Sequence, residues 1–192
     1  MKKRIALFIM AIITSYTLAF ANNSIDKLKS FANIANKGSE IGFLFTAIDK
    51  NGSMLYNSQG TTLVYNEMFS LQVPDELLVV DNKVNRWLYK INNEEIIVMD
   101  ATLQEASIAD NPFAFLRSEN IESIKNYTVE VEERTGTTLP SLKSVPQKII
   151  LTSLAGIKYI IEINSFKESP QLSSYSFVLD LSRYPDAYVV EM

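Results

Sequence analysis

The feature that most constrains the fold is a set of three short apolar runs, at residues 77–80, 87–91 and 96–99, each separated from the next by turn residues. Asp81-Asn82-Lys83 fills the first gap and Asn92-Asn93 fills the second. Asn and Asp suit such turns because they tolerate positive φ and hydrogen-bond to their own backbone. Two tight turns between β-rich runs predict an antiparallel meander.

The chain before this meander predicts further strands of the same sheet. Residues 39–48 alternate with a period of two and carry apolar side chains on both faces, so we expect both faces to be covered. Lys50-Asn51-Gly52 is a strong hairpin signal, and the return strand 54–65 contains Gly60, which predicts a bulge or bend. A run at 69–73 leads into the meander, which gives six consecutive antiparallel strands.

The rest of the chain raises the count to about ten strands and two or three short helices. Apolar residues between positions 25 and 35 recur at helical spacing, and Gly38 follows as a C-cap. The other segments are weaker helices at 101–109 and 121–125, a loop of unpredicted conformation at 135–146, and strands at 127–133, 148–152, 158–164 and 175–181.

A single sheet of this size must curl or split. We therefore predict a mainly β protein with short helices (α+β). Its strongly curved antiparallel sheet, or unclosed β-barrel, is covered by an N-terminal helix and by short lid helices. No internal repeat or low-complexity segment interrupts the chain.

The first 21 residues have the pattern of a cleaved export signal. Lys2, Lys3 and Arg4 precede an apolar run at 5–18, and Ala-Phe-Ala at 19–21 is a small-x-small cleavage site. A transmembrane anchor is the alternative, but the run is shorter than the ~20 residues that a bilayer requires. We expect cleavage after Ala21, a single domain at 22–192, and no lipid tether because the chain has no Cys.

Composition excludes several classes of function. Removing residues 1–21 takes three of the 18 basic residues and none of the 22 acidic ones, which leaves a net charge of about −7. Such a balance argues against nucleic-acid binding, which depends on clustered Lys and Arg. With no His and no Cys, Ser–His and Cys–His nucleophile pairs and imidazole or thiolate metal ligands are excluded. No metal site, cofactor or catalytic residue is predicted.

Two motifs resemble a known family. D-N-K-x-x-R-W-L-Y at 81–89, followed by a hairpin partner, a short helix and N-P-F-x-F-L at 111–116, is similar to the LolA-like periplasmic carriers of outer-membrane lipoproteins, in a Bacteroidetes-type variant. The closing segment, in which Tyr184-Pro185 precedes a short apolar strand, is also similar.

The resemblance implies a soluble, monomeric periplasmic carrier. Such a protein shelters the acyl chains of lipid-modified proteins between the inner and outer membranes. Its partners are an ATP-driven releasing complex in the inner membrane and an acceptor in the outer membrane. The cargo and the outer-membrane partner are not specified by the sequence.

A carrier of this kind needs an apolar cavity between sheet and lid. Phe113 and Phe115 are the strongest ligand-binding candidates because they follow a proline break. Packing in an ordinary core is the alternative for every aromatic residue, and Met99 offers an adaptable thioether contact. The full set of predicted cavity and lid residues is Phe43, Phe45, Leu63, Tyr65, Phe69, Leu71, Trp87, Tyr89, Met99, Phe113, Phe115 and Leu116.

The family's lid latch has no counterpart at its expected position. Better-known members carry Arg followed by Pro near the second hairpin, where this chain reads Y-N-E-M-F at 65–69. Arg86 and Arg117 are the nearby guanidinium groups, and we expect them to be solvated surface charges rather than latches.

Two other classes of function stay open. The chain is alternatively a binding protein or sensor for another amphiphile, such as a glycolipid. The more distant alternative is an enzyme that uses Asp49, Asp81 and Asp100, although turn formation or N-capping explains each of these residues.

Overall fold

The computed structural model describes residues 23–102, 108–109, 111–117, 123–135, 142, 144–169 and 171–192. Ten strands form one unclosed sheet in the order β10-β6-β5-β4-β3-β2-β1-β9-β8-β7. The strands are β1 (Ser39–Ile48), β2 (Met54–Tyr65), β3 (Met68–Val73), β4 (Leu77–Asp81), β5 (Asn85–Lys90), β6 (Glu95–Asp100), β7 (Thr128–Glu133), β8 (Pro146–Thr152), β9 (Lys158–Glu168) and β10 (Tyr188–Glu191). The predicted fold class is confirmed.

The first six strands form the predicted meander, in which each strand pairs antiparallel with the next. The turns between them use the left-handed backbone region at Asn66, Asp75, Lys83 and Glu94. At the β4–β5 turn, the Asp81 carboxylate accepts a hydrogen bond from the Lys83 N–H (2.8 Å), while the Asn82 side chain accepts one from Asn85 N–H (2.8 Å). Side-chain bonding to the backbone therefore fixes this turn, as the sequence predicts.

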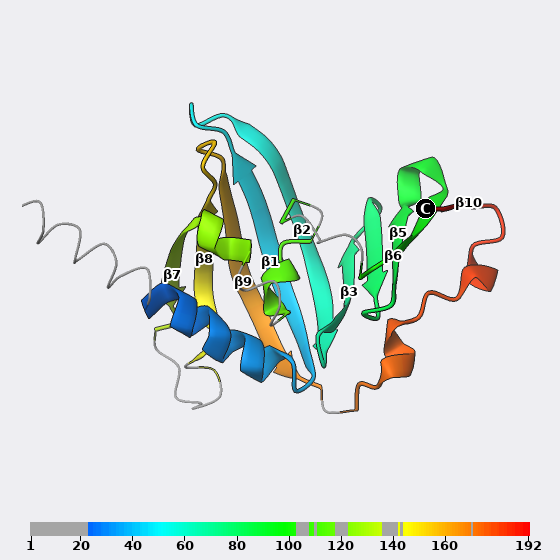
Figure 1. Ribbon diagram of the computed structural model, residues 1–192, viewed down its shortest axis with the longest axis horizontal. Coiled ribbons are helices and arrows are strands. Elements are labelled where there is room, and N and C mark those ends of the chain that lie inside the picture. Colours follow the sequence, from blue (N-terminus) through cyan, green and yellow to red (C-terminus); the bar gives the residue numbers. More distant parts are fainter. Residues whose placement is uncertain are drawn as a thin grey trace, which may run out of the picture.

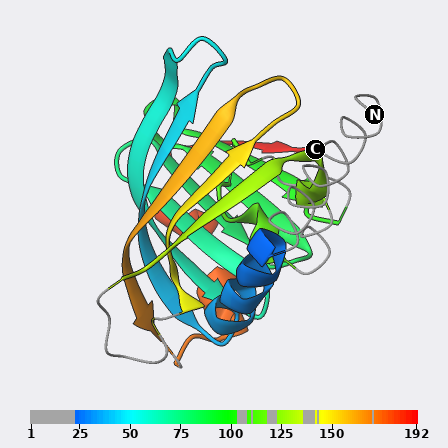
Figure 2. The ribbon, with the colours of Figure 1, turned by 90° about the vertical axis from the view of Figure 1, so that its left-hand side faces the viewer.

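An N-terminal helix, described over residues 23–35, lies in the concavity of the curled sheet (Figures 1 and 2). Its apolar face is fully or almost fully buried at Leu28, Phe31, Ala32 and Ala35. Gly38 follows with φ of 114°, a conformation open mainly to glycine, and the chain then enters β1. Short 3-10 turns η2 (Ala114–Leu116) and η3 (Ser123–Asn126) accompany the helix.

The C-terminal segment differs from the prediction. The expected strand 175–181 is absent, and η5 (Ser174–Phe177) and η6 (Leu181–Arg183) occupy this part of the chain. Phe177 and Leu179 are buried in a second apolar cluster with Met68, Val80, Trp87 and Ile96. The segment crosses the face of β3–β6 that points away from the helix, which we call the convex face, before β10 pairs parallel with β6 (Figure 1). At positions 175–181, burial of Phe177 and Leu179 therefore takes the place of the expected strand pairing.

Two other predictions about strands need correction. β9 extends to Glu168, where it pairs with Ser39, so the segment 165–168 is strand rather than connection. β2 has no bulge at Gly60, which pairs regularly with Phe43. A Cβ at position 60 would lie 2.4 Å from the Gln72 carbonyl oxygen and 2.8 Å from the Phe43 ring, so this glycine permits close packing.

Some predictions fall outside the described residues. These are the export signal at 1–21, most of the helix predicted at 101–109, the start of the one at 121–125, and much of the loop at 135–146. Within the described ranges, none of the helices combines the length and apolar character needed to cross a membrane.

Replacing Gly60 with alanine tests its packing role. Because the added methyl group would meet the Gln72 carbonyl and the Phe43 ring, we expect Gly60→Ala to lower the free energy of unfolding by about 1 to 3 kcal/mol. Urea denaturation measures this change. The control is Gln59→Ala, at the exposed neighbouring position of the same strand, where a substitution should have little effect. A neutral Gly60→Ala variant would contradict the packing account.

Two aromatic residues of the C-terminal segment provide a matched pair of substitutions. Phe177 is fully buried and Tyr175 is 89% exposed. We expect Phe177→Ala to cost about 3 to 5 kcal/mol of folding stability through the cavity it leaves, and Tyr175→Ala to have little effect. Thermal or urea denaturation of both variants checks this. Equal effects would mean that the segment is not anchored on the convex face through Phe177.

Candidate functional site

The largest apolar cluster lies between the sheet and the elements in its concavity. Phe43, Phe45, Leu71, Val79, Ile149 and Ile161 come from the sheet, and Leu28, Phe31, Phe113, Phe115, Leu116 and Ile124 come from the elements that cover it. The ring of Phe113 meets that of Phe43 edge-on, with centroids 5.2 Å apart, and lies 6.2 Å from that of Phe115. We call the N-terminal helix together with residues 111–117 the cover, because these side chains fill the concave face.

The predicted cavity residues divide between the two faces of the sheet. Phe43, Phe45, Leu71, Phe113, Phe115 and Leu116 belong to the concave cluster. Strand alternation also places Phe69, which is buried, and Met99, which is half-buried, on the concave face. Leu63, Tyr65, Trp87 and Tyr89 lie on the convex face, under the C-terminal segment. The structure therefore brings eight of the twelve together, while ligand binding by any of them stays a prediction.

A buried ionic group joins the cover to the sheet. Asp81 is inaccessible to solvent, and its carboxylate accepts a hydrogen bond from Arg86 Nε at 2.8 Å and another from Arg117 Nη2. Arg86 lies across the β4–β5 hairpin, in register with Asp81, whereas Arg117 ends the cover segment. Both arginines are less than 10% exposed, so the expectation of solvated surface charges is wrong. We call Asp81, Arg86 and Arg117 the clamp.

Arg117 makes two further contacts with the sheet. Its guanidinium carbon lies 4.9 Å from the centroid of the Phe69 ring, and its Nε donates to the Glu67 carbonyl at 3.1 Å. These contacts satisfy a buried cation through a carboxylate, an aromatic face and a backbone oxygen. One signal in the sequence could have found two of the three clamp residues: Asp81 and Arg86 face each other across the predicted hairpin.

Asn36 reinforces the same end of the cover. Its Nδ2 donates to the Leu116 carbonyl at 2.9 Å, and its Oδ1 accepts from the Glu67 N–H at 2.8 Å. Its own carbonyl accepts from the Asn66 N–H at 2.9 Å. The C-terminal end of the helix, the end of the cover segment and the β2–β3 turn are therefore held together by polar contacts.

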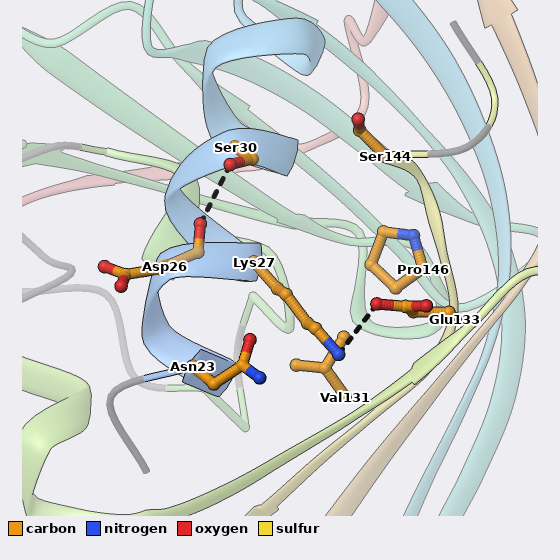
Figure 3. A pocket seen from close by; sticks show the side chains of 8 residues that line it. All are labelled: Asn23, Asp26, Lys27, Ser30, Val131, Glu133, Ser144 and Pro146. Carbon is orange, nitrogen blue, oxygen red and sulfur yellow. Dashed lines mark hydrogen bonds and ion pairs between the residues drawn. The ribbon is translucent and has the colours of Figure 1, made fainter. Parts of the chain in front are cut away.

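The other end of the helix borders a cleft instead. A cavity of about 230 Å³ separates its first turns from β7 and β8, and Asn23, Lys27, Val131, Glu133 and Pro146 are among its lining residues (Figure 3). The Lys27 ammonium group spans the cleft to Glu133 at 2.7 Å, but the Glu133 side chain is well exposed and that of Lys27 is partly exposed. An exposed ion pair of this kind contributes little to stability. Within the described part of the chain, the buried polar contacts of the cover therefore lie at one end, and an exposed ion pair lies at the other.

Aromatic residues line the concave face toward the β1–β2 and β8–β9 turns. The rings of Tyr56, Phe45, Tyr159 and Tyr127 contact one another in that order, with centroid distances of 5.9, 6.2 and 6.2 Å. Burial raises the pKa of the Tyr56 hydroxyl, and it also raises the pKa of the Tyr127 hydroxyl. Both phenols are therefore uncharged at neutral pH, which suits an apolar surface. The sequence analysis did not select these three tyrosines, because alternation alone does not reveal contacts between distant strands.

The three carboxylates weighed for catalysis have separate structural roles. Asp49 accepts hydrogen bonds from the Asn51 and Ser53 N–H groups in the β1–β2 turn. Asp100 is bound by Thr102 through its backbone N–H and hydroxyl, which lower the pKa of this exposed carboxyl group. Asp81 belongs to the clamp, and Asp49 lies at the opposite end of the sheet. Among the described residues, no group of three or more acidic side chains is placed to hold a metal ion.

Solved structures of low sequence identity are similar to this one. An uncharacterised conserved protein from Thermus thermophilus matches with a TM-score of 0.51 and 10% identity, over 87% of this chain and 98% of that one. A DUF1329 family protein from Desulfovibrio piger gives 0.44 and 9%, over 83% and 97%. A LolA superfamily protein from Nitrosomonas europaea gives 0.43 and 8%, over 83% and 98%.

The Thermus match concerns the fold alone, and the two lower TM-scores support no further conclusion. No protein-family model matches the chain, and no curated protein sequence matches it either.

The clamp predicts a large cost for removing its shared carboxylate. Asp81→Ala leaves two buried guanidinium groups without their anion, so we expect a loss of about 3 to 5 kcal/mol in the free energy of unfolding. Urea denaturation measures this loss. Glu95→Gln, which removes the partner of the exposed Lys90, is the control and should leave the midpoint nearly unchanged. Similar midpoints for both variants would contradict the clamp.

Proposed function

We propose that this protein is a periplasmic carrier that shelters the acyl chains of lipid-modified proteins during their transfer from the inner to the outer membrane. Its partners are then a releasing complex driven by ATP and an outer-membrane acceptor. The proposal takes its cargo class, location and partners from the sequence resemblance of residues 81–89 and 111–116 to LolA-like carriers. Residues 1–21 are the export signal in this proposal.

One structural observation carries the proposal: an apolar concave face lies under a cover that is held by polar contacts at one end and bordered by a cleft at the other. Phe31, Phe113 and Phe115 are the largest side chains of the cover within the cluster. If the helix lifts at the cleft, an acyl chain replaces these side chains on the sheet. Phe43, Phe45 and Leu71 then form the floor of the binding site.

Energetics favour a covered site over an open one. Burying a methylene group contributes about 0.8 kcal/mol, so an acyl chain of ~16 carbons gains roughly 12 kcal/mol. A permanently open cavity would retain the chain too firmly for transfer to an acceptor. Displacing the cover offsets part of this gain, because its phenylalanines lose their contacts with the sheet. The absence of Cys means that no disulfide locks the cover in place.

Binding of a fluorescent lipopeptide to residues 22–192 tests the proposal directly. We expect saturable binding at micromolar concentration, competed by a hydrophobic dye, because both probes require the same apolar surface. Mass spectrometry of lipids that copurify with the protein separates a lipoprotein carrier from a binding protein for glycolipids. Failure to bind any acyl ligand at micromolar concentration would contradict the proposal.

A reversible cross-link across the cleft tests whether the helix must move. Lys27 and Glu133 are in contact, both are exposed, and the chain has no other cysteine, so Lys27→Cys with Glu133→Cys offers two unique reactive sites. Bridging them with a cleavable bis-maleimide should weaken acyl binding at least about tenfold, and reductive cleavage of the linker should restore it. Each single-cysteine variant, treated in the same way, is the control. Unchanged affinity in the bridged protein would mean that acyl chains enter by another route.

A further inference from the structure

The turns of two neighbouring hairpins form one end of the molecule (Figures 1 and 2). They are residues 49–53 between β1 and β2, and residues 153–157 between β8 and β9. Ile48 of β1 pairs with Met54 of β2 on one side and with Lys158 of β9 on the other. Both hairpins therefore turn at the same height along β1. A Cβ on Gly156 would lie 3.0 Å from Lys50 Cβ, which places the two turns in contact. We call residues 49–56 and 153–158 the hairpin tips.

The hairpin tips expose an unusual amount of apolar side chain. Leu154 is 92% exposed, Met54 63%, Leu55 57% and Tyr56 38%. Large apolar residues at a turn between strands require an explanation, since turns are normally polar. The Tyr56 ring packs on Phe45, but the concave cluster does not explain Leu154, Met54 and Leu55, which are not part of it.

The tips also project beyond the neighbouring turns, which are acidic. The last pair between β2 and β3 joins Thr61 to Gln72, and β2 continues for seven more residues to Met54. Seven residues of strand correspond to roughly 20 Å. The backbone of the β3–β4 turn, which contains Asp75 and Glu76, is therefore set back from Met54. The Glu76 carboxylate nevertheless reaches the near side of the first tip, where it accepts a hydrogen bond from the Tyr56 hydroxyl at 3.1 Å.

Several backbone N–H groups at the tips are satisfied within the turns. In the first turn, the Asp49 side chain accepts from the Asn51 and Ser53 N–H groups, and the Gly52 N–H donates to the Asp49 carbonyl. In the second turn, the Gly156 N–H donates to the Ser153 carbonyl, and the Ile157 N–H donates to Ser153 Oγ. Moving these turns out of water therefore leaves these donors paired, which a lipid environment demands.

The hairpin tips carry a small positive charge. Lys50 and Lys158 are exposed, and Asp49 is the one acidic residue of the tips, so two lysines against one aspartate leave a formal charge of +1 on a chain whose net charge is −4. Apolar side chains combined with lysines at their margin are typical of segments that enter a membrane interface. We propose that the hairpin tips dock on the surface of an anionic phospholipid bilayer, with Leu154, Leu55 and Met54 entering the interface.

A bilayer fits this surface better than a protein partner does. A stable protein interface buries about 800 Å² on each partner. Two narrow turns that protrude from a sheet form a small convex surface instead. The proposal goes beyond the acyl-carrier function, because docking needs neither an acyl ligand nor movement of the cover.

Sedimentation with lipid vesicles tests the proposal. Residues 22–192, which contain every described element, should bind vesicles of equimolar phosphatidylcholine and phosphatidylglycerol. Leu154→Asp combined with Leu55→Asp should lower the partition coefficient about tenfold or more, because two apolar anchors are lost. The matched control is Val84→Asp. Val84 is 63% exposed, as Met54 is, but lies in the β4–β5 turn at the opposite end of the sheet.

A second vesicle-binding experiment reverses the charge of the two lysines. Lys50→Glu with Lys158→Glu should weaken binding to the mixed vesicles several-fold and leave binding to pure phosphatidylcholine nearly unchanged. Circular dichroism melting confirms that each variant is folded. The protein bridged at positions 27 and 133 should still bind vesicles, so failure of the carrier proposal and failure of docking are distinguishable.

Three results would overturn the proposal. One is an unaltered chain that does not sediment with the mixed vesicles, and another is equal loss of binding in the tip variant and in Val84→Asp. The third is a tip variant that keeps vesicle binding but loses self-association in light scattering. The tips would then contact a second copy of the chain.

Discussion

The architecture depends on one constraint: the central strands are apolar on both faces, so both faces need a cover. Alternation places Leu71 and Val79 on the concave face and Met68 and Val80 on the convex face. A sheet of ten strands leaves both faces too large for its own curl to bury. The N-terminal helix and residues 111–117 cover one face, and the C-terminal segment covers the other. The C-terminal segment differs from the cover in how it is attached, because its strand β10 also pairs with β6.

The clamp explains why the concave cover takes one defined position. Apolar side chains pack on a sheet in many arrangements of similar energy, whereas a buried carboxylate between two guanidinium groups tolerates few. Arg117 fixes the end of the cover over Phe69, and Asn36 fixes the end of the helix beside it. Replacing such a group with apolar residues is often stabilising, so its value lies in specificity. In the proposed carrier, this arrangement directs motion of the helix to the end that borders the cleft.

Local patterns in the sequence were sufficient to predict the meander, the first hairpin and the helix, because these elements depend on neighbouring residues. The C-terminal segment was predicted wrongly. Phe177 and Leu179 alternate like strand residues, but they are buried against strands that are distant in the sequence. Trp87 and Tyr89 were grouped with Phe43 for a related reason: alternation separates two faces, but it does not say which face the helix covers. Arg117 was misjudged because a charge is expected at the surface, and its partner Asp81 is 36 positions away.

The proposed docking of the hairpin tips and the proposed binding of acyl chains under the cover address one physical problem, the movement of an apolar chain through water. An acyl chain that leaves a bilayer is exposed in proportion to the distance it travels before it is buried again. The row of Tyr56, Phe45, Tyr159 and Tyr127 crosses the sheet beside the hairpin tips, and Phe45 belongs to the concave cluster. If the tips rest on a membrane, these aromatic rings lie between the lipid interface and the rest of the concave cluster. The cost of transfer is then set by displacement of the cover and not by hydration of the cargo.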